Sequence, residues 1–507
     1  PAQEYFLIPK EMFDKRKDLQ FCGRTLFGAK PPKGQELDDH YFGVIKPRVA
    51  EFMADLNETL WKLGILAKTE HNEVAPAQHE LAPIYATTNI ATDHNQLTME
   101  IMQKVAAKHG LVCLLHEKPF AGVNGSGKHN NWSMATDTGV NLLTPGETPY
   151  ENAQFLLFLC AVIKAVDDYQ DLLRLAVATA GNDHRLGANE APPAVVSMFL
   201  GDELTAVLDA IENDKPYSGT EKTVMKLGVH ILPKFTRDNT DRNRTSPFAF
   251  TGNKFEFRML GSSNSIACTN IMLNAAVAES LKIYADRLEN AEDFETALHD
   301  MIKKTIKDHK RIIFNGNGYD DSWIKEATEK RGLLNLRTTP DALPKILDKK
   351  NVEMLTSLKV FTEAEIRSRY EITLENYCKT VNIEALTMVD MTKKEILPAI
   401  ESYIKELSKT ASLKVEAVPG LTSKYESETI SRLSLLSDEI YTAVCELEKS
   451  LIELKTASDI TEESVMIRDV ILNKMAALRV PCDEAETLTA EKYWPFPTYG
   501  ELLFGVK

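Results

Sequence analysis

The segment from Asn72 to Glu80 (Asn-Glu-Val-Ala-Pro-Ala-Gln-His-Glu) restricts the fold of this chain more than any other stretch of its sequence. Two carboxylates and a histidine crowd this run, and Pro76 interrupts it, so the segment is too short and too broken for a helix. Carboxylate and imidazole groups gathered in this way suit Mg²⁺ or Mn²⁺. We therefore expect Glu73 and Glu80 to bind a divalent cation. A polar loop whose acids face water is the alternative for these residues taken alone.

A second polar cluster runs from Asn124 to Ser133 (Asn-Gly-Ser-Gly-Lys-His-Asn-Asn-Trp-Ser). Beyond its glycines the residues alternate, which predicts a strand with His129, Asn131 and Ser133 on one face. A lone histidine on a strand is more often a structural group than a ligand. Here a Gly-rich turn precedes it and lets a bound molecule approach the backbone closely. His129 is therefore a candidate metal ligand.

The same segment resembles a phosphate-binding P-loop, because Gly122, Gly127 and Lys128 have the G-x-x-x-x-G-K spacing. That motif requires Ser or Thr after the lysine and a helix beyond it. His129 occupies the position instead, and a strand is predicted to follow. A P-loop nucleotidase is therefore disfavoured.

A third pattern places Lys254, Glu256 and Arg258 on one face of a predicted strand. Taken alone, this pattern is more typical of a solvated edge strand with a cross-strand ion pair. The chain carries other groups that change this interpretation, namely Arg185, Glu190, Arg242 and Arg244. Acids that hold metals and arginines that hold phosphates are the two halves of a phosphoryl-transfer site. The clusters together predict such a site.

Apolar residues that recur every three or four positions predict a helix across residues 44–66. Further helices are expected near residues 92–109, 150–178, 202–213 and 265–290. Short alternating segments at 80–87, 128–134 and 254–259 suit antiparallel strands. Most of the metal-type residues fall on or beside these strands.

The sequence changes character beyond about Leu343, where charged, Gly-poor sequence predicts a helical region that pauses at Val418-Pro419-Gly420 and resumes until Pro481. A heptad-like seam from Ile430 to Leu454 favours a helical hairpin packed on its neighbours over a coiled-coil dimer. The aromatic, Pro-rich tail should dock on the protein. We expect a catalytic domain over residues 1–345, a helical domain over 346–480 and a docking tail over 481–507.

The formal net charge of −15 argues against binding to nucleic acid or to an anionic membrane. The longest apolar stretch is interrupted by Lys164 and Asp167 before it reaches the roughly 20 residues of a bilayer crossing. Seven scattered cysteines without a C-x-x-C pair indicate reduced thiols rather than a disulfide framework. These features favour a cytoplasmic protein. Because residues 4–8 already resemble a strand interior, we expect the chain to begin within a domain.

Six separated motifs, in the same order along the chain, resemble those of glutamine synthetases. The motifs are Gln3-Glu4-Tyr5-Phe6, Asn72 to Glu80, Asn124 to His129, Arg185 to Pro192, Asn243-Arg244 and Glu256-Phe257-Arg258. They cover roughly the first half of the sequence. Residues 28–37, the C-terminal helices and the tail around Trp494 look like the long type III branch of that family.

The resemblance implies an α+β catalytic domain, with an antiparallel sheet curved around a two-metal cleft and backed by helices. It implies ATP-dependent ligation of ammonia to L-glutamate, which yields L-glutamine, ADP and phosphate through γ-glutamyl phosphate. It also implies a homo-oligomer, a dodecamer of stacked rings.

Roles for individual residues follow from the same resemblance. One Mg²⁺ or Mn²⁺ would be held by Glu4, Glu73 and Glu80, and a second by His129 and Glu256. Asn124, Gly125 and Arg185 would bind glutamate, whereas Asn131, Ser133, Lys254 and Arg244 would bind the nucleotide. Arg244, Arg258 and the flap carboxylate Glu190 would act in catalysis.

The sequence departs from the family pattern most at Ala2, where a glutamate usually ligates the second metal, so that site is expected to be weakened. Asn131 and Lys254 replace a histidine and an arginine of the type I branch. We also expect this sequence to lack most of the family's small N-terminal β-domain. Two alternatives stay open: a γ-glutamyl ligase for another amine, and a catalytically reduced homologue with a structural or regulatory role.

Overall fold

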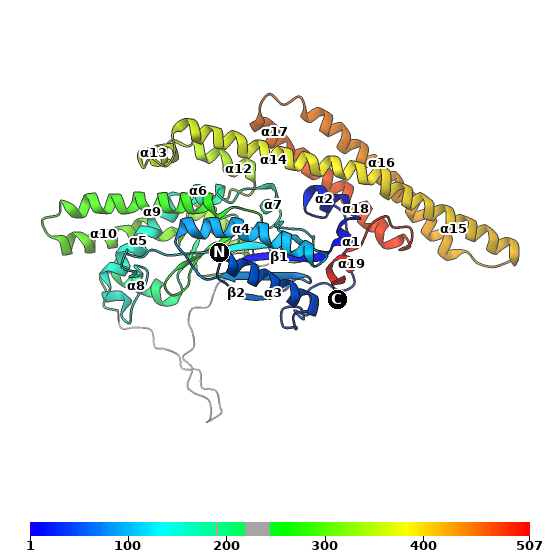
Figure 1. The fold of residues 1–507 in the computed structure, drawn as a ribbon. Coiled ribbons are helices and arrows are strands. Elements are labelled where there is room, and N and C mark those ends of the chain that lie inside the picture. Colours follow the sequence, from blue (N-terminus) through cyan, green and yellow to red (C-terminus); the bar gives the residue numbers. More distant parts are fainter. Residues whose placement is uncertain (189–190, 218–243, 507) are drawn as a thin grey trace.

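The computed structural model describes residues 1–188, 191–217 and 244–506. Its N-terminal part combines two four-stranded sheets with helices, and its C-terminal part is built from long helices that cross above the sheets (Figure 1). The expected α+β class is confirmed. The sheet arrangement differs from the expectation, because the described strands form two sheets and one of them contains a parallel pair.

The first sheet has the strand order β2 (Ala67–Asn72), β3 (Gln78–Pro83), β1 (Gln3–Pro9) and β4 (Leu111–Leu114), with every pair antiparallel. Of its two central strands, β1 is buried on both faces. Tyr5 and Leu7 pack into the core beneath α3 (Pro47–Lys62) and α4 (Thr88–Lys108). Phe6 and Ile8 alternate to the opposite face and contribute to a second core cluster.

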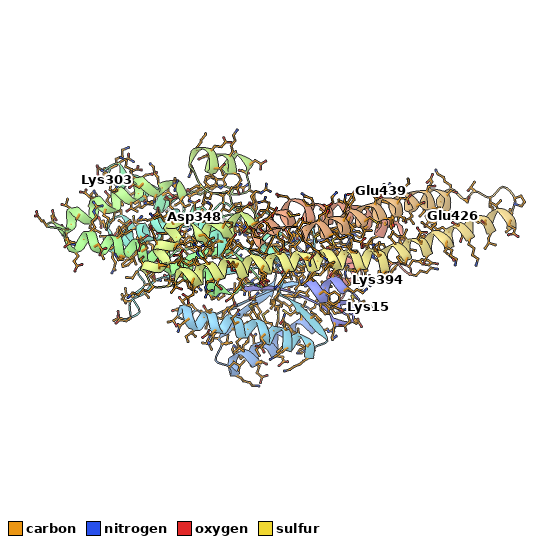
Figure 2. All side chains as sticks on the ribbon, turned by 90° about the horizontal axis from the view of Figure 1, so that it is seen from above. Lys15, Lys303, Asp348, Lys394, Glu426 and Glu439 are labelled. Atoms are coloured by element: carbon orange, nitrogen blue, oxygen red, sulfur yellow. The ribbon has the colours of Figure 1, made fainter. Side chains whose placement is uncertain are left out.

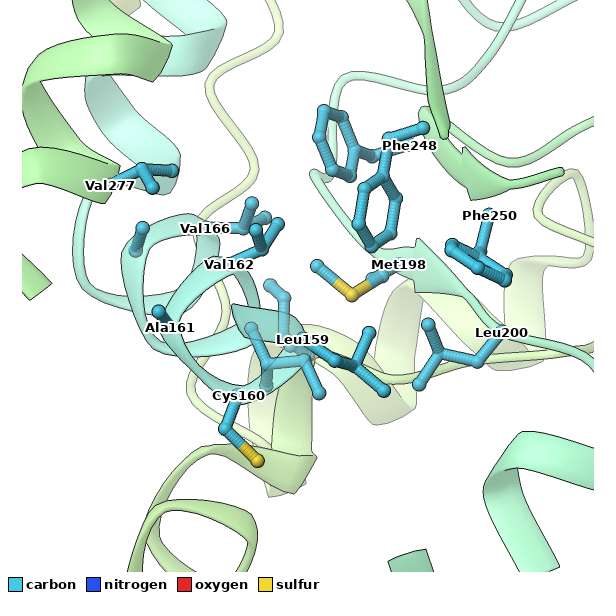
Figure 3. Packing of buried hydrophobic residues seen from close by; sticks show 14 of the residues in the cluster. Leu159, Cys160, Ala161, Val162, Val166, Met198, Leu200, Phe248, Phe250 and Val277 are labelled. Carbon is cyan, nitrogen blue, oxygen red and sulfur yellow. The ribbon is translucent and has the colours of Figure 1, made fainter. Parts of the chain in front are cut away.

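The second sheet has the order β5 (Gly127–Trp132), β8 (Phe255–Gly261), β7 (Phe248–Phe250) and β6 (Met198–Phe199). The pairs β5–β8 and β8–β7 are antiparallel, whereas β7–β6 is parallel. Side chains of α5 (Ala153–Asp168) face Met198 and Phe248 in its core (Figure 3). The apolar face of this sheet is thereby buried, and its polar face remains for the site.

The predicted helices form close to their expected positions. The helices expected near residues 44–66, 92–109, 202–213 and 265–290 are α3, α4, α8 (Asp202–Glu212) and α9 (Ile266–Glu289). The helix expected across 150–178 is divided, because α5 ends at Asp168 and α6 (Gln170–Leu175) begins after Tyr169. The strands expected at 80–87, 128–134 and 254–259 are β3, β5 and β8 with shifted ends.

The long helices of the C-terminal part are α14 (Glu363–Met391), α15 (Leu397–Ala417), α16 (Lys424–Leu454) and α18 (Leu472–Leu488). Val418, Pro419 and Gly420 separate α15 from α16, as the sequence predicts. Figure 2 shows that the α15–α16 hairpin extends away from the sheets, with Glu426 near its free end. The seam from Leu433 to Leu454 is buried against neighbouring helices of the same chain, which confirms the predicted hairpin.

The helix that was expected to end near Pro481 continues to Leu488. Proline removes one backbone hydrogen bond and disfavours a helix interior by about 3 kcal/mol. Burial of Pro481 itself and of Cys482 and Ala485 in the C-terminal core opposes this cost. Tertiary packing therefore overrides the local signal.

The aromatic tail docks on the protein, as predicted. Trp494 and Phe496 are buried in the C-terminal core, and Tyr499 packs against Phe120 beneath the first sheet. Among the described residues, no helix has both the length and the apolar character that a bilayer crossing requires. The remaining elements are α1 (Lys10–Phe13), α2 (Lys17–Cys22), α7 (Ala180–Asp183), α10 (Phe294–His309), α11 (Asp321–Lys325), α12 (Thr339–Ala342), α13 (Lys349–Ser357), α17 (Ile460–Met466), α19 (Tyr499–Phe504), and the short 3₁₀ or π turns 149–151, 310–312, 326–330, 343–347, 392–396 and 467–471.

Candidate active site

Two acidic side chains lie opposite each other on the first sheet. Glu4 of β1 and Glu80 of β3 are direct partners in the antiparallel register. Like charges in such positions destabilise a sheet unless a cation lies between them. Burial raises the pKa of Glu4 above its ordinary value, and His129 nearby opposes that shift. Ligand atoms of Glu4, Glu80 and His129 all lie within 4.8 Å of one another.

A second group of ligand-type atoms shares Glu80. His71 lies opposite Glu80 in the β2–β3 hairpin, and its Nε2 is 2.7 Å from the Glu80 carboxylate. Its Nδ1 is 3.6 Å from the carboxylate of Glu73, which begins the connecting loop. The hydrogen bond with Glu80 raises the pKa of His71 to about 9. Glu73 and Glu80 therefore converge, as the sequence predicts.

Sequence reasoning missed His71. The histidine noticed in the Asn72–Glu80 segment was His79, but the structure turns its ring away from the acids. The His79 Nδ1 lies 3.0 Å from the side-chain oxygen of Asn72, and burial lowers the pKa of this imidazole to about 3. A sequence signal for His71 does exist. If residues 73–77 are taken as the turn of a hairpin, His71 on one strand lies opposite Glu80 on the other, and their side chains share a face.

The second sheet supplies the other acids and the second imidazole. The register of β5 with β8 shifts between Lys128 and Asn130, which marks a bulge in β8 opposite His129. Its Nδ1 is 3.4 Å from Glu256, and its Nε2 is 3.9 Å from Glu4. That Nε2 is buried and has no hydrogen-bond partner within the described residues. An unpartnered buried imidazole nitrogen facing carboxylates fits a bound metal ion.

The other charged side chain of β8 points to the same place. The Arg258 guanidinium donates to the second carboxylate oxygen of Glu256 at 3.2 Å, and both side chains are buried. Its Nε is buried without a hydrogen-bond partner in the described residues. The strand that could have been a solvated edge is therefore buried, and the Arg258 Nε can donate to an anionic ligand.

One small pocket lies among these groups, and Glu4, Glu73 and His129 are the acids and the imidazole that line it. It is lined by Glu4, Glu73, Gln78, Asn124, Gly125, His129 and Arg185. The Arg185 guanidinium donates to the carbonyl oxygens of Leu260 at 3.1 Å and Arg258 at 3.3 Å. Gly127 leaves space for this side chain, because a Cβ there would lie 2.2 Å from an Arg185 nitrogen. Predicted ligands of metals and of glutamate are thus brought to one pocket.

The predicted nucleotide-binding residues lie at the other end of the β5–β8 ladder. Asn131 is exposed and lies opposite Glu256, and Ser133 donates a hydrogen bond to the carbonyl oxygen of Asn253 at 2.9 Å. Lys254 is half-buried immediately before β8. Arg244 is exposed ahead of β7. Arg242 and Glu190, the predicted flap carboxylate, lie outside the described residues.

Comparisons with known proteins identify the family of this chain. The model of the glutamine synthetase catalytic domain matches residues 1–195, and the model of the glutamine synthetase C-terminal domain matches residues 297–415. A glutamine synthetase of Butyrivibrio fibrisolvens is 50% identical, with 100% of this chain and 72% of that protein covered. The type-3 glutamine synthetase of Dictyostelium discoideum is 44% identical, with coverages of 99% and 69%. A glutamine synthetase of Bacteroides fragilis is 42% identical, with coverages of 99% and 70%. This chain belongs to the glutamine synthetase family, the ATP-dependent glutamate–ammonia ligases.

Proposed function

We propose that the pocket between β1, β3, β5 and β8 is the active site in which this chain ligates ammonia to L-glutamate with ATP. One observation carries the proposal. Ligand atoms of Glu80 lie within 4.8 Å of those of Glu4 and His129 and also of Glu73, and His129 lies 3.4 Å from Glu256, although these residues come from four separate parts of the sequence. Carboxylates crowded at such distances repel one another, so the folded chain gains stability from a cation there.

Two divalent cations fit the donor groups. Glu4, Glu73 and Glu80 would hold one Mg²⁺ or Mn²⁺, and His129 with Glu256 would hold the other. Oxygen donors with one imidazole suit these ions. When bound, the ions neutralise phosphate charge and polarise the transferred phosphoryl group. Ala2 offers no ligand atom, so the second ion has one donor fewer than the usual family pattern supplies.

The amino-acid substrate would lie against Asn124, Gly125 and Arg185. The buried Arg185 guanidinium offers charge to a substrate carboxylate, and burial strengthens such a pairing because little water competes. Arg258 lies beside Glu256 and would approach the γ-carboxylate as phosphate arrives. Arginine suits this position because its planar donors match carboxylate and phosphate oxygens.

The nucleotide would extend along the other end of the β5–β8 ladder, past Asn131, Ser133 and Lys254, with Arg244 at its phosphates. The substrate γ-carboxylate then attacks the terminal phosphorus, and ADP leaves. Ammonia attacks the carbonyl carbon of the resulting γ-glutamyl phosphate, and phosphate leaves as the C–N bond forms. Glu190 would accept the proton that ammonium must lose before this attack.

A combined binding and activity experiment tests this proposal. Titration calorimetry with Mn²⁺ should show at least tenfold weaker binding to Glu80→Gln than to wild type, because the Glu80 carboxylate is close to Glu4 and His129 on one side and to His71 and Glu73 on the other. Glu100→Gln is the matched control, since Glu100 is an exposed acid that pairs with Lys104 on α4. Wild type should release phosphate only with glutamate and ammonium present. Unchanged Mn²⁺ binding by Glu80→Gln would contradict the proposed site.

Amine preference in the same assay separates the ammonia ligase from a γ-glutamyl ligase for larger amines. For the ammonia ligase, we expect methylamine and ethylamine to support at most a minor fraction of phosphate release. We also propose assembly into a dodecamer of stacked rings. Light scattering of the intact protein would measure its mass directly, and a monomer would contradict this assembly.

A further inference from the structure

Residues 28–40 form a strap that runs from the C-terminal helices to the metal-type ligands. At its start, the Gly28 N–H donates to Asp483 of α18 at 2.8 Å. Arg479 of the same helix donates to the Gly28 carbonyl oxygen at 3.1 Å. At its end, His40 Nδ1 lies 2.7 Å from the backbone oxygen of Glu73. The strap is thus anchored at both ends.

Gln35, between these anchors, makes two hydrogen bonds with Asn124, which lines the pocket. The Asn124 backbone N–H donates to Gln35 Oε1 at 2.8 Å. Gln35 Nε2 donates to Asn124 Oδ1, also at 2.8 Å. The two hydrogen bonds form a closed ring of atoms that joins the Gln35 side chain of the strap to Asn124 in the loop that precedes β5.

The chemistry of this ring fixes the orientation of both amide groups. A backbone N–H is only a donor, so the Gln35 atom that faces it must be the oxygen. The nitrogen of Gln35 then faces Asn124 and requires an acceptor, so the Asn124 atom must be Oδ1. The remaining polar atom of Asn124 is Nδ2, a donor. Within residues 1–188, 191–217 and 244–506, this Nδ2 has no hydrogen-bond partner.

A free amide nitrogen can serve only an acceptor on a bound molecule. An amino-acid substrate offers acceptors at its carboxylates, whereas its ammonium group is a donor. The buried Arg185 guanidinium lines the same pocket, so a carboxylate there would meet two kinds of donor. Asn124 in the reverse orientation would direct its oxygen at that carboxylate and repel it.

We propose that Gln35 is a positioning residue of the active site, which locks the Asn124 amide so that Nδ2 donates to a carboxylate oxygen of the amino-acid substrate. The inference rests on the proposed function, which assigns glutamate to this pocket. It adds a residue that lies outside the pocket lining and acts only through Asn124. Because α18 anchors the strap, the C-terminal helices support the orientation of a substrate-binding group.

Two substitutions of Gln35 test the orientation. Gln35→Ala removes the lock, and we expect the KM for glutamate to rise on the order of fivefold with the KM for ATP unchanged. Gln35→Glu retains an acceptor for the Asn124 backbone N–H but offers no donor to the Asn124 side chain. The new carboxylate therefore attracts Nδ2 of Asn124, and the amide turns so that Oδ1 faces the pocket. We therefore expect a larger rise, about tenfold or more. Leu37→Ala is the control, because Leu37 is an exposed residue of the same strap.

The outcomes separate this inference from the proposed function. A wild-type KM for glutamate in both Gln35 variants, with a raised KM in Asn124→Ala, would overturn the inference alone. A wild-type KM in Asn124→Ala would overturn the assignment of glutamate to this pocket and the inference with it. A fall in kcat with no change in KM would also contradict a positioning role. Thermal unfolding midpoints close to that of Leu37→Ala would establish that the Gln35 and Asn124 variants are folded.

Discussion

The Tyr499 ring lies directly against the α-carbon of Gly28. A Cβ built on Gly28 would lie 2.1 Å from Cε1 of this ring, and the glycine has a φ of +155°. The Tyr499 hydroxyl lies 2.6 Å from Thr25 Oγ1 and accepts a hydrogen bond from Arg479 at 2.9 Å. The C-terminal tail, the strap and α18 therefore meet at one buried contact.

Gly28→Ala should destabilise the protein by about 2 to 4 kcal/mol, because the new methyl group meets a rigid ring and the backbone is strained. Urea unfolding measures this change. Gly500→Ala in α19 is the matched control, since a Cβ there would lie 3.9 Å from its nearest neighbours, Pro31 and Thr498. The control should be neutral or stabilising by about 0.5 to 1 kcal/mol. Equal effects of both substitutions would contradict the close contact.

Asp18→Ala should cost about 3 to 5 kcal/mol, because it leaves a buried guanidinium without its partner. Both side chains of the Arg16–Asp18 pair are fully buried, and two hydrogen bonds of 2.9 and 2.6 Å join them. The exposed pair Lys10–Asp14 supplies the comparison, and Asp14→Ala should cost less than about 1 kcal/mol. Equal unfolding free energies of Asp18→Ala and Asp14→Ala would contradict the buried position of the Arg16–Asp18 pair.

The sequence predicted the parts of the site that follow from local alternation. Burial along β5 alternates as predicted, with Lys128, Asn130 and Trp132 buried, so His129 projects to the other face. The convergence of Glu4 with Glu80 required strand pairing across distant parts of the chain. No local pattern specifies such pairing, and the family resemblance supplied it.

What the sequence did not predict depends on tertiary contacts. The role of His71 beside Glu80 depends on the register of a hairpin, and a one-residue slip would have turned its ring to the other face. The pairing of Gln35 with Asn124 joins residues far apart in the sequence through a strap with no regular structure. Continuation of α18 through Pro481 depends on burial in a core formed by other helices.

The carboxyl group of Glu486 should make stability depend on pH. Burial raises its pKa from 4.5 to about 7, although Arg16 and Arg479 oppose the shift. Between these values the folded protein keeps a proton that the unfolded chain loses. The contribution of this group to stability is therefore full below pH 4.5 and is lost as the pH rises toward 7.

Glu486→Gln should remove this dependence, because glutamine resembles the protonated acid at every pH. The unfolding free energy of wild type relative to the variant should fall by on the order of 2 to 3 kcal/mol between pH 4.5 and 7.5. Urea unfolding across that range measures it, and Glu491→Gln on an exposed residue of the same region is the control. If the difference in unfolding free energy between wild type and Glu486→Gln stayed constant across this pH range, Glu486 would ionise in the folded protein as it does in the unfolded chain.

Ala2→Glu should strengthen the second metal site. Ala2 precedes β1, and its N–H donates to the carbonyl oxygen of His129 at 3.2 Å. Residues two apart on a strand share a face, so a glutamate at position 2 would project to the same side as Glu4 and approach His129. The added carboxylate supplies the ligand atom that alanine lacks.

Mn²⁺ titration should then show a tighter second site in Ala2→Glu, by about tenfold for one added charged ligand, with the first site unchanged. Ala2→Gln is the control, since it adds similar bulk without the charge and should change the affinity much less. Raised affinity at the first site alone would mean that the new side chain projects toward Glu80 rather than Glu256. Unchanged occupancy at both sites would show that position 2 does not face the metals.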